Sequence, residues 1–184
     1  MTRALASRLV MPLLAALALA FLVVMVVNGA QPRQRQLVKF EAKGVLRLEP
    51  EGVSKILLSR GGRQTQLARR GDGGWALTPD AVVAPALATH LDTALKMLHR
   101  SAPVREMAPE DLVGVDTRPF GLEDPAVVAA LWGPAGHVLT VRFGARNPEG
   151  FLQYMRIEGD PKVYLMSRFI GAEWLAAVEG AEAP

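Results

Sequence analysis

The sequence predicts an α+β fold: mainly antiparallel sheet, with a packed helix after each of two strand meanders, plus one N-terminal transmembrane helix. Three observations predict it. A run of about 19 residues without charged or strongly polar side chains lies near the N-terminus. Short apolar segments separated by glycine and proline turns fill much of the remaining chain, which is typical of antiparallel strands. Two further stretches space their apolar residues as a helix does.

The apolar run spans Leu9–Val27, LVMPLLAALALAFLVVMVV. At about 1.5 Å per residue, a helix of this length covers roughly 30 Å, the thickness of a bilayer core. A cleaved secretory signal is the alternative, but its apolar core is shorter, and Asn28–Ala30 is a poor match to a small-residue cleavage site. We therefore expect an uncleaved transmembrane anchor over residues 1–28.

A basic juxtamembrane linker is predicted over residues 29–44. Of the 21 basic and 18 acidic side chains in the chain, seven basic ones and one acidic one precede Leu48, which leaves 14 basic and 17 acidic residues from there onward. The basic excess therefore flanks the apolar run, where it suits anionic lipid headgroups. Nucleic acid is not an expected partner. The candidate membrane-surface residues are Arg33, Arg35, Lys39 and Lys43.

The first half of the remaining chain reads as a meander of strands followed by a helix. Apolar segments bounded by proline or glycine turns predict strands at Val45–Leu48, Val53–Arg60, Gln64–Arg69 and Trp75–Thr78. A helix is predicted next over Pro85–His99. Proline suits a first helical turn, and apolar residues recur at i, i+4, i+7, i+8 and i+11 from Leu87.

The second half repeats this order after a short helical turn at Pro109–Val113. A helix over Arg168–Val178, capped by Ser167, is predicted to close it. Its predicted strands are Ala126–Trp132, His137–Phe143, Phe151–Glu158 and Lys162–Met166. The order of elements suggests an internal duplication. We thus expect one extramembrane domain over residues 45–184, with similar halves at 45–99 and 126–178 that share a core.

Several segments of this domain together resemble the bacterial domain-of-unknown-function family 4340, over about residues 53–168. They are GGWALTP at Gly73–Pro79, FGLEDP at Phe120–Pro125, FGARNPEG at Phe143–Gly150 and QYMRIEGDPKVYLM at Gln153–Met166. The resemblance implies a cell-envelope protein held by one N-terminal helix, and some relatives accompany ABC-type transporters related to gliding motility or export. It supplies no catalytic residues.

The residue types do not favour an enzyme. The chain has no cysteine, which excludes thiolate zinc sites and cysteine nucleophiles. Of its three histidines, His90 and His99 lie on nearly opposite faces of one predicted helix, so they are not spaced as metal ligands. We expect no catalytic residues, no metal site and no cofactor.

Four arginines crowd one predicted hairpin around Gly61–Gly62. They are Arg60, Arg63, Arg69 and Arg70. Guanidinium groups so placed could bind a phosphate or an acidic partner through paired donors. Equally, they could protect an exposed strand edge from unwanted pairing. This patch is the candidate partner-binding site.

The function expected from the sequence is that of a non-enzymatic, membrane-anchored accessory subunit or assembly factor. Its periplasmic domain would dock on a partner membrane-protein complex in the bacterial inner membrane. The alternative is a domain that binds a small molecule, glycan or lipid for an ABC-type transporter. A convergent pocket between the two halves would favour ligand binding, whereas a filled core with a flat exposed sheet would favour docking.

Overall fold

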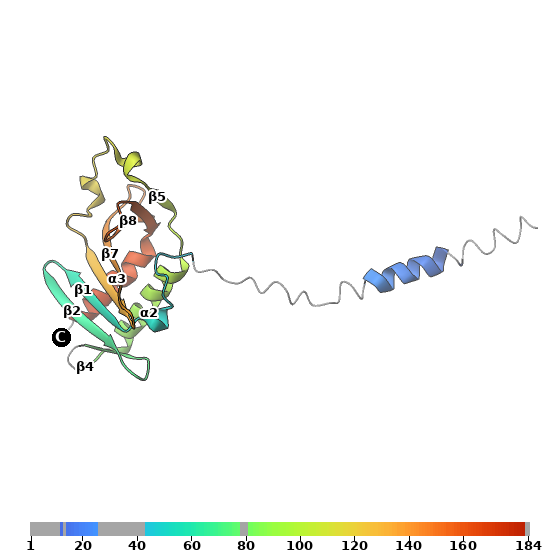
Figure 1. The fold of residues 1–184 in the computed structure, drawn as a ribbon, viewed down its shortest axis with the longest axis horizontal. Coiled ribbons are helices and arrows are strands. Elements are labelled where there is room, and N and C mark those ends of the chain that lie inside the picture. The colour runs from blue at the N-terminus through green and yellow to red at the C-terminus, as the bar shows by residue number, and fades with distance from the viewer. Residues whose placement is uncertain (1–11, 13, 26–42, 78–80, 183–184) are drawn as a thin grey trace, which may run out of the picture. The chain divides into compact units, whose positions relative to one another are not determined.

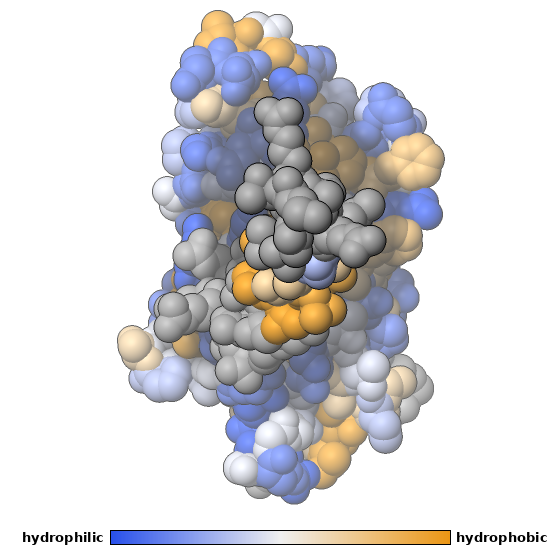
Figure 2. Space-filling model, turned by 90° about the vertical axis from the view of Figure 1, so that its right-hand side faces the viewer, coloured by the Kyte–Doolittle hydropathy of each residue, from blue (hydrophilic) through white to orange (hydrophobic). Residues whose placement is uncertain are grey.

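The computed structural model of the chain describes residues 12, 14–25, 43–77 and 81–182. They belong to two compact units, Met1–Glu41 and Ala42–Pro184. In the first unit, residues 14–25 are helical (Figure 1), and their apolar side chains are exposed, forming a hydrophobic group in Figure 2. No helix within the described residues is long and apolar enough to cross a membrane.

The second unit is built on one antiparallel sheet of nine strands, in the spatial order β4-β3-β2-β1-β6-β7-β8-β9-β5. Most neighbours in the sheet are also neighbours along the chain, and the exceptions are the β1–β6 pair and the β9–β5 pair. The strands are β1 (Lys55–Arg60), β2 (Arg63–Arg69), β3 (Trp75–Leu77), β4 (Ala81–Val82), β5 (Arg105–Met107), β6 (Val127–Gly133), β7 (Gly136–Arg146), β8 (Leu152–Ile157) and β9 (Val163–Ser167).

Two α-helices, α2 (Pro85–Arg100) and α3 (Arg168–Glu182), pack against each other and against one face of this sheet (Figure 1). Helix α2 begins at a proline, whose missing N–H is not needed in a first turn. Its apolar stripe from Leu87 to Leu98 is buried. Short 3-10 helices form at η1 (Pro50–Gly52), η2 (Pro109–Leu112) and η3 (Arg118–Phe120).

The main core lies between the sheet and these two helices. Alternate strand residues contribute to it, because successive side chains of a strand point to opposite faces. Its largest fully buried members include Ile56, Leu58, Leu131 and Phe143 from the strands, Leu91, Leu95 and Leu98 from α2, and Trp174 from α3.

A second, smaller cluster covers the opposite face at one end of the sheet. It joins Phe120 and Leu122, from the segment between β5 and β6, to apolar residues of β5 and β9. These strand residues are Met107, Val163 and Leu165. The connection between β5 and β6 thus shields strands β9 and β5 on the side away from the helices.

The fold class predicted from the sequence is wrong. The predicted halves do not form two meanders, each with its own packed helix, because β1 and β6 pair and merge the strands into a single sheet. Two separate meanders would each leave strand edges with unpaired N–H and C=O groups, and the β1–β6 ladder satisfies two of these edges. The predicted transmembrane helix is not found among the described residues, none of whose helices is long and apolar enough to span a membrane. The helical residues 14–25 cover about 18 Å at 1.5 Å per residue, and the rest of Leu9–Val27 lies outside the described residues apart from Pro12.

The predicted strand at Val45–Leu48 is a loop instead. The backbone amides of Gly44 and Leu46 donate to the carbonyl oxygens of His99 and Leu98, at 3.0 and 3.1 Å. These carbonyls end α2 and have no partner within the helix. A Cβ at Gly44 would lie 2.0 Å from the Leu98 oxygen, so this close approach needs glycine. The segment terminates a helix rather than extending the sheet.

Candidate functional site

The two faces of the sheet differ, because side chains alternate along each strand. In β1, Ile56 and Leu58 face α2 and α3 and are buried, whereas Lys55, Leu57 and Ser59 face the other way and are partly exposed. We call this second face, over strands β2, β1, β6, β7 and β8, the open face. Its residues are Gln64, Gln66, Ala68, Lys55, Leu57, Ser59, Val128, Ala130, Trp132, Thr140, Arg142, Arg156 and Glu158.

Two arginines lie side by side on the open face. Arg142 of β7 and Arg156 of β8 are directly opposite one another in the strand register. The side chain of Arg142 reaches only Glu158, with 3.8 Å between Nη2 and Oε2. The Nε of Arg156 is buried and has no hydrogen-bond partner among the described residues. Like charges directly opposite each other destabilise a sheet, so a further carboxylate near both guanidinium groups would stabilise this pair.

An aromatic and cationic group lies farther along the open face. The Nζ of Lys55 lies 4.0 Å from the ring centroid of Trp132, and the ring of His137 meets the same indole edge-on at 5.5 Å between centroids. A lysine ammonium over an indole is attracted by the ring electrons. His137 is held by Thr140, with 2.8 Å between Nε2 and Oγ1. Trp132 is therefore held in place while part of its surface remains exposed.

Between the tryptophan and the arginines lie apolar residues that are only half-buried: Leu57, Val128 and Ala130. The other end of the face is bounded by Tyr154, whose ring stacks on Phe120 with 4.1 Å between centroids. Apolar and aromatic residues accompanied by arginine are typical of the centre of protein–protein interfaces. The open face therefore has the composition of a docking surface.

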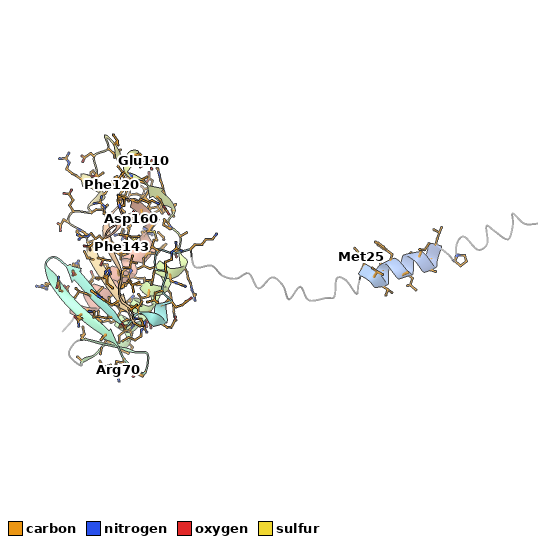
Figure 3. The ribbon with its side chains drawn as sticks, viewed as in Figure 1. Met25, Arg70, Glu110, Phe120, Phe143 and Asp160 are labelled. Atoms are coloured by element: carbon orange, nitrogen blue, oxygen red, sulfur yellow. The ribbon has the colours of Figure 1, made fainter. Side chains whose placement is uncertain are left out.

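The structure separates the four arginines of the predicted patch into two pairs. Arg60 and Arg63 flank the turn between β1 and β2, and Arg60 Nη1 lies 3.3 Å from Glu179 Oε1 of α3. Arg69 and Arg70 lie at the opposite end of β2, and Arg70 Nη2 lies 3.1 Å from Asp72 Oδ2. Figure 3 shows Arg70 at the other end of the domain from Glu110 and Phe120. The four therefore do not converge on one ligand.

Arg69 is occupied by the fold itself. Its guanidinium donates to the carbonyl oxygens of Val53, Gly73 and Pro50 at 2.8, 3.0 and 3.1 Å, and lies 3.5 Å from Asp92 Oδ1. It also stacks over the ring of Trp75, 4.2 Å from the centroid. This arginine ties β2 to the turns beside it and to α2, so few of its donors remain for a partner.

Of the candidate membrane-surface residues, Arg33, Arg35 and Lys39 lie outside the described residues. Lys43, the first described residue of the second unit, is exposed.

Several titratable groups of the described residues have structural partners. His90 Nδ1 lies 2.7 Å from Glu173 Oε2, and His99 lies between the Leu46 carbonyl and Glu49. The hydrogen bond from the Tyr164 hydroxyl holds the pKa of the Asp160 carboxyl below its usual range. No group of three or more histidine or acidic side chains among the described residues could hold a metal ion.

A cavity of about 210 Å³ lies between α3 and strands β6, β7 and β8. Gln153 reaches its wall and is 8% exposed, and its Nε2 donates to the Gly144 carbonyl at 2.8 Å. The cavity is smaller than the roughly 300–1,000 Å³ of typical small-molecule sites. It lies within the second predicted half, not between the two.

Sequence reasoning did not select Arg142 and Arg156 as functional residues. Each occupies a polar position in an alternating strand, between Val141 and Phe143 in β7 and between Met155 and Ile157 in β8. That alternation indicates which face they share. Their adjacency depends on the pairing register of β7 with β8, which includes an irregularity between Phe143 and Arg146.

Comparison with protein-family models, with curated proteins and with solved structures found no match to this chain. The resemblance to family 4340 therefore stays a prediction, and the open face is the feature on which a proposal of function can be built.

Proposed function

We propose that this chain is a non-enzymatic accessory subunit or assembly factor of a membrane-protein complex, and that its main domain docks on the partner through the open face. One observation carries the proposal: both α-helices of this domain cover one side of the sheet, while the other side presents half-buried apolar residues and two adjacent arginines. A partly apolar sheet face that also carries arginines suits a protein surface better than a small ligand.

We further propose that the domain lies on the periplasmic side of a bacterial inner membrane. The exposed apolar side chains of residues 14–25, such as Leu17, Phe21 and Met25, need an apolar environment. The basic residues of the linker favour anionic headgroups beside it. The periplasmic side rests on the resemblance to family 4340.

Site-specific photo-crosslinking in bacterial membranes tests the docking proposal. The photoreactive residue p-benzoyl-phenylalanine replaces Ser59 on the open face of the full-length chain, and in a matched variant it replaces Lys96, which is exposed on α2. We expect a discrete protein adduct from position 59 and several-fold less from position 96. Equal labelling from both positions, or none from position 59, would exclude the open face as the docking surface.

Ligand binding for an ABC-type transporter is the second candidate, and the cavity beside α3 is the observation that favours it. Native mass spectrometry of the protein released gently from membranes tests it. The Ala172→Leu variant places a larger side chain in the cavity. A bound small molecule that is lost in this variant would favour ligand binding over docking.

A further inference from the structure

We propose that Arg142 and Arg156 form a carboxylate-binding site, so that the open face docks on an acidic segment of the partner protein. This inference rests on the proposed function and adds the chemistry of the partner. Each guanidinium presents several N–H donors in a plane, which matches the two oxygens of a carboxylate.

The first argument comes from the register. Arg142 and Arg156 face each other across the β7–β8 ladder, and the row continues through Val128 of β6 to Ser59 of β1. A cross-strand pair of like charges costs stability relative to a neutral pair. An anion that contacts both guanidinium groups would remove this repulsion, so the bound state gains more than the energy of a single ion pair.

The second argument comes from hydrogen bonding. Buried N–H groups in folded proteins nearly always have a partner, yet the Nε of Arg156 is buried without one. Glu158 forms an ion pair with Arg142 at 3.8 Å, and 58% of its side chain stays exposed. Arg142 therefore has one long ion pair and Arg156 has none among the described residues, so both guanidinium groups can pair with a further carboxylate.

The third argument is the contrast in charge between this face and the rest of the domain. The open face carries Lys55, Arg142 and Arg156 against the single acid Glu158, whereas residues from Leu48 onward hold 14 basic and 17 acidic side chains. A positive face on an acidic domain steers acidic partners toward it and repels them elsewhere.

A protein carboxylate fits this face better than a lipid headgroup or free phosphate. The arginines adjoin half-buried Val128 and Ala130, which would stay solvated against a headgroup. A peptide segment can cover these apolar residues while its acidic side chains reach the arginines. Apolar contact with desolvated arginine is typical of interface centres.

The test uses the full-length chain carrying p-benzoyl-phenylalanine at position 59 in membranes, with and without the neutral substitutions Arg142→Gln and Arg156→Gln together. We expect the double variant to lower the yield of the protein adduct about tenfold or more, corresponding to roughly 1.4 kcal/mol. Lys96→Gln, which removes one positive charge from the exposed surface of α2, should leave the yield unchanged. The unfolding midpoint of each variant, followed by tryptophan fluorescence, controls for folding.

Mass spectrometry of the adduct then identifies the crosslinked peptide. We expect an aspartate or glutamate within a few residues of the crosslink, and we expect that changing it to arginine restores the adduct of an Arg142→Glu variant. An adduct that forms equally well in the double glutamine variant, or a peptide without nearby acids, would overturn the carboxylate site while leaving docking intact. An adduct to phospholipid would also overturn it. Absence of any adduct would instead remove the docking proposal itself.

Discussion

The two faces of the nine-stranded sheet are made from alternate residues of the same strands, yet they serve different ends. On the covered face, side chains such as Ile56 and Phe143 are fully buried against α2 and α3. On the open face, Leu57 and Val128 are only half-buried, Arg142 has a single long ion pair with Glu158, and the Nε of Arg156 has no hydrogen-bond partner among the described residues. The covered face accounts for stability and leaves the open face free to carry features that are unfavourable in isolation, as expected of a binding surface.

Truncation of one apolar residue on each face tests whether the two faces contribute unequally to stability. Phe143→Ala should lower the free energy of unfolding by about 3–5 kcal/mol, because it opens a cavity in the main core. Leu57→Ala should cost less than about 1 kcal/mol, because its side chain already contacts water. Urea unfolding of the full-length chain in detergent measures both values. Similar losses for the two variants would mean that the open face is covered in the free protein.

The next largest effect separates structural arginines from those available to a partner. Arg69→Ala should cost about 2–4 kcal/mol, because it removes the donors for the carbonyls of Val53, Gly73 and Pro50. Arg63→Ala, at the exposed hairpin, should stay within about 0.5 kcal/mol of the parent. The measurement is again urea unfolding. A small loss for Arg69→Ala would refute its role in holding β2 to α2.

Two buried tryptophans of the main core allow a finer test. The indole Nε1 of Trp75 donates to Asp92 Oδ1 at 3.0 Å, whereas the Nε1 of Trp174 is buried without a partner among the described residues. Replacement by phenylalanine costs packing at both sites, but only Trp75→Phe also removes a hydrogen bond. We expect Trp75→Phe to be the more costly by about 1–2 kcal/mol in thermal unfolding. The reverse order would point to an acceptor for Trp174.

The smallest expected effect depends on pH. The Tyr164 hydroxyl and the Lys162 amide donate to Asp160, which lowers the pKa of its carboxyl below the ordinary value of about 3.9. A lowered pKa in the folded chain stabilises it above that ordinary value, and the stabilisation disappears as the pH falls through the lowered pKa. The parent should therefore exceed Asp160→Asn in stability by less than about 1 kcal/mol at pH 7, and by less still near pH 3. Unfolding midpoints at the two pH values measure this, and a difference that grows on acidification would contradict it.

The elements that were predictable are those whose signal is local. The leucine stripe after Pro85 predicted α2 to within one residue at its C-terminus, and the glycine and proline turns separated β1, β2, β6 and β7. The short edge strands β4 and β5 were not predicted, because two or three residues cannot show an alternating pattern. The apolar residues of Val45–Leu48 suit a strand, but the amides of Leu46 and of the preceding Gly44 donate to the carbonyls that end α2.

By itself, the sequence determined the turns, the helical stripes and which strand residues point to the same side, because these depend on backbone preferences and on spacing along the chain. Only the tertiary structure decided that β1 pairs with β6, that Arg69 donates to backbone carbonyls of other segments and that Arg142 lies beside Arg156. Each of these three contacts joins residues that are distant in sequence, through strand register or through a carbonyl that has no partner in its own element. These contacts depend on long-range pairing, which no local sequence pattern indicates.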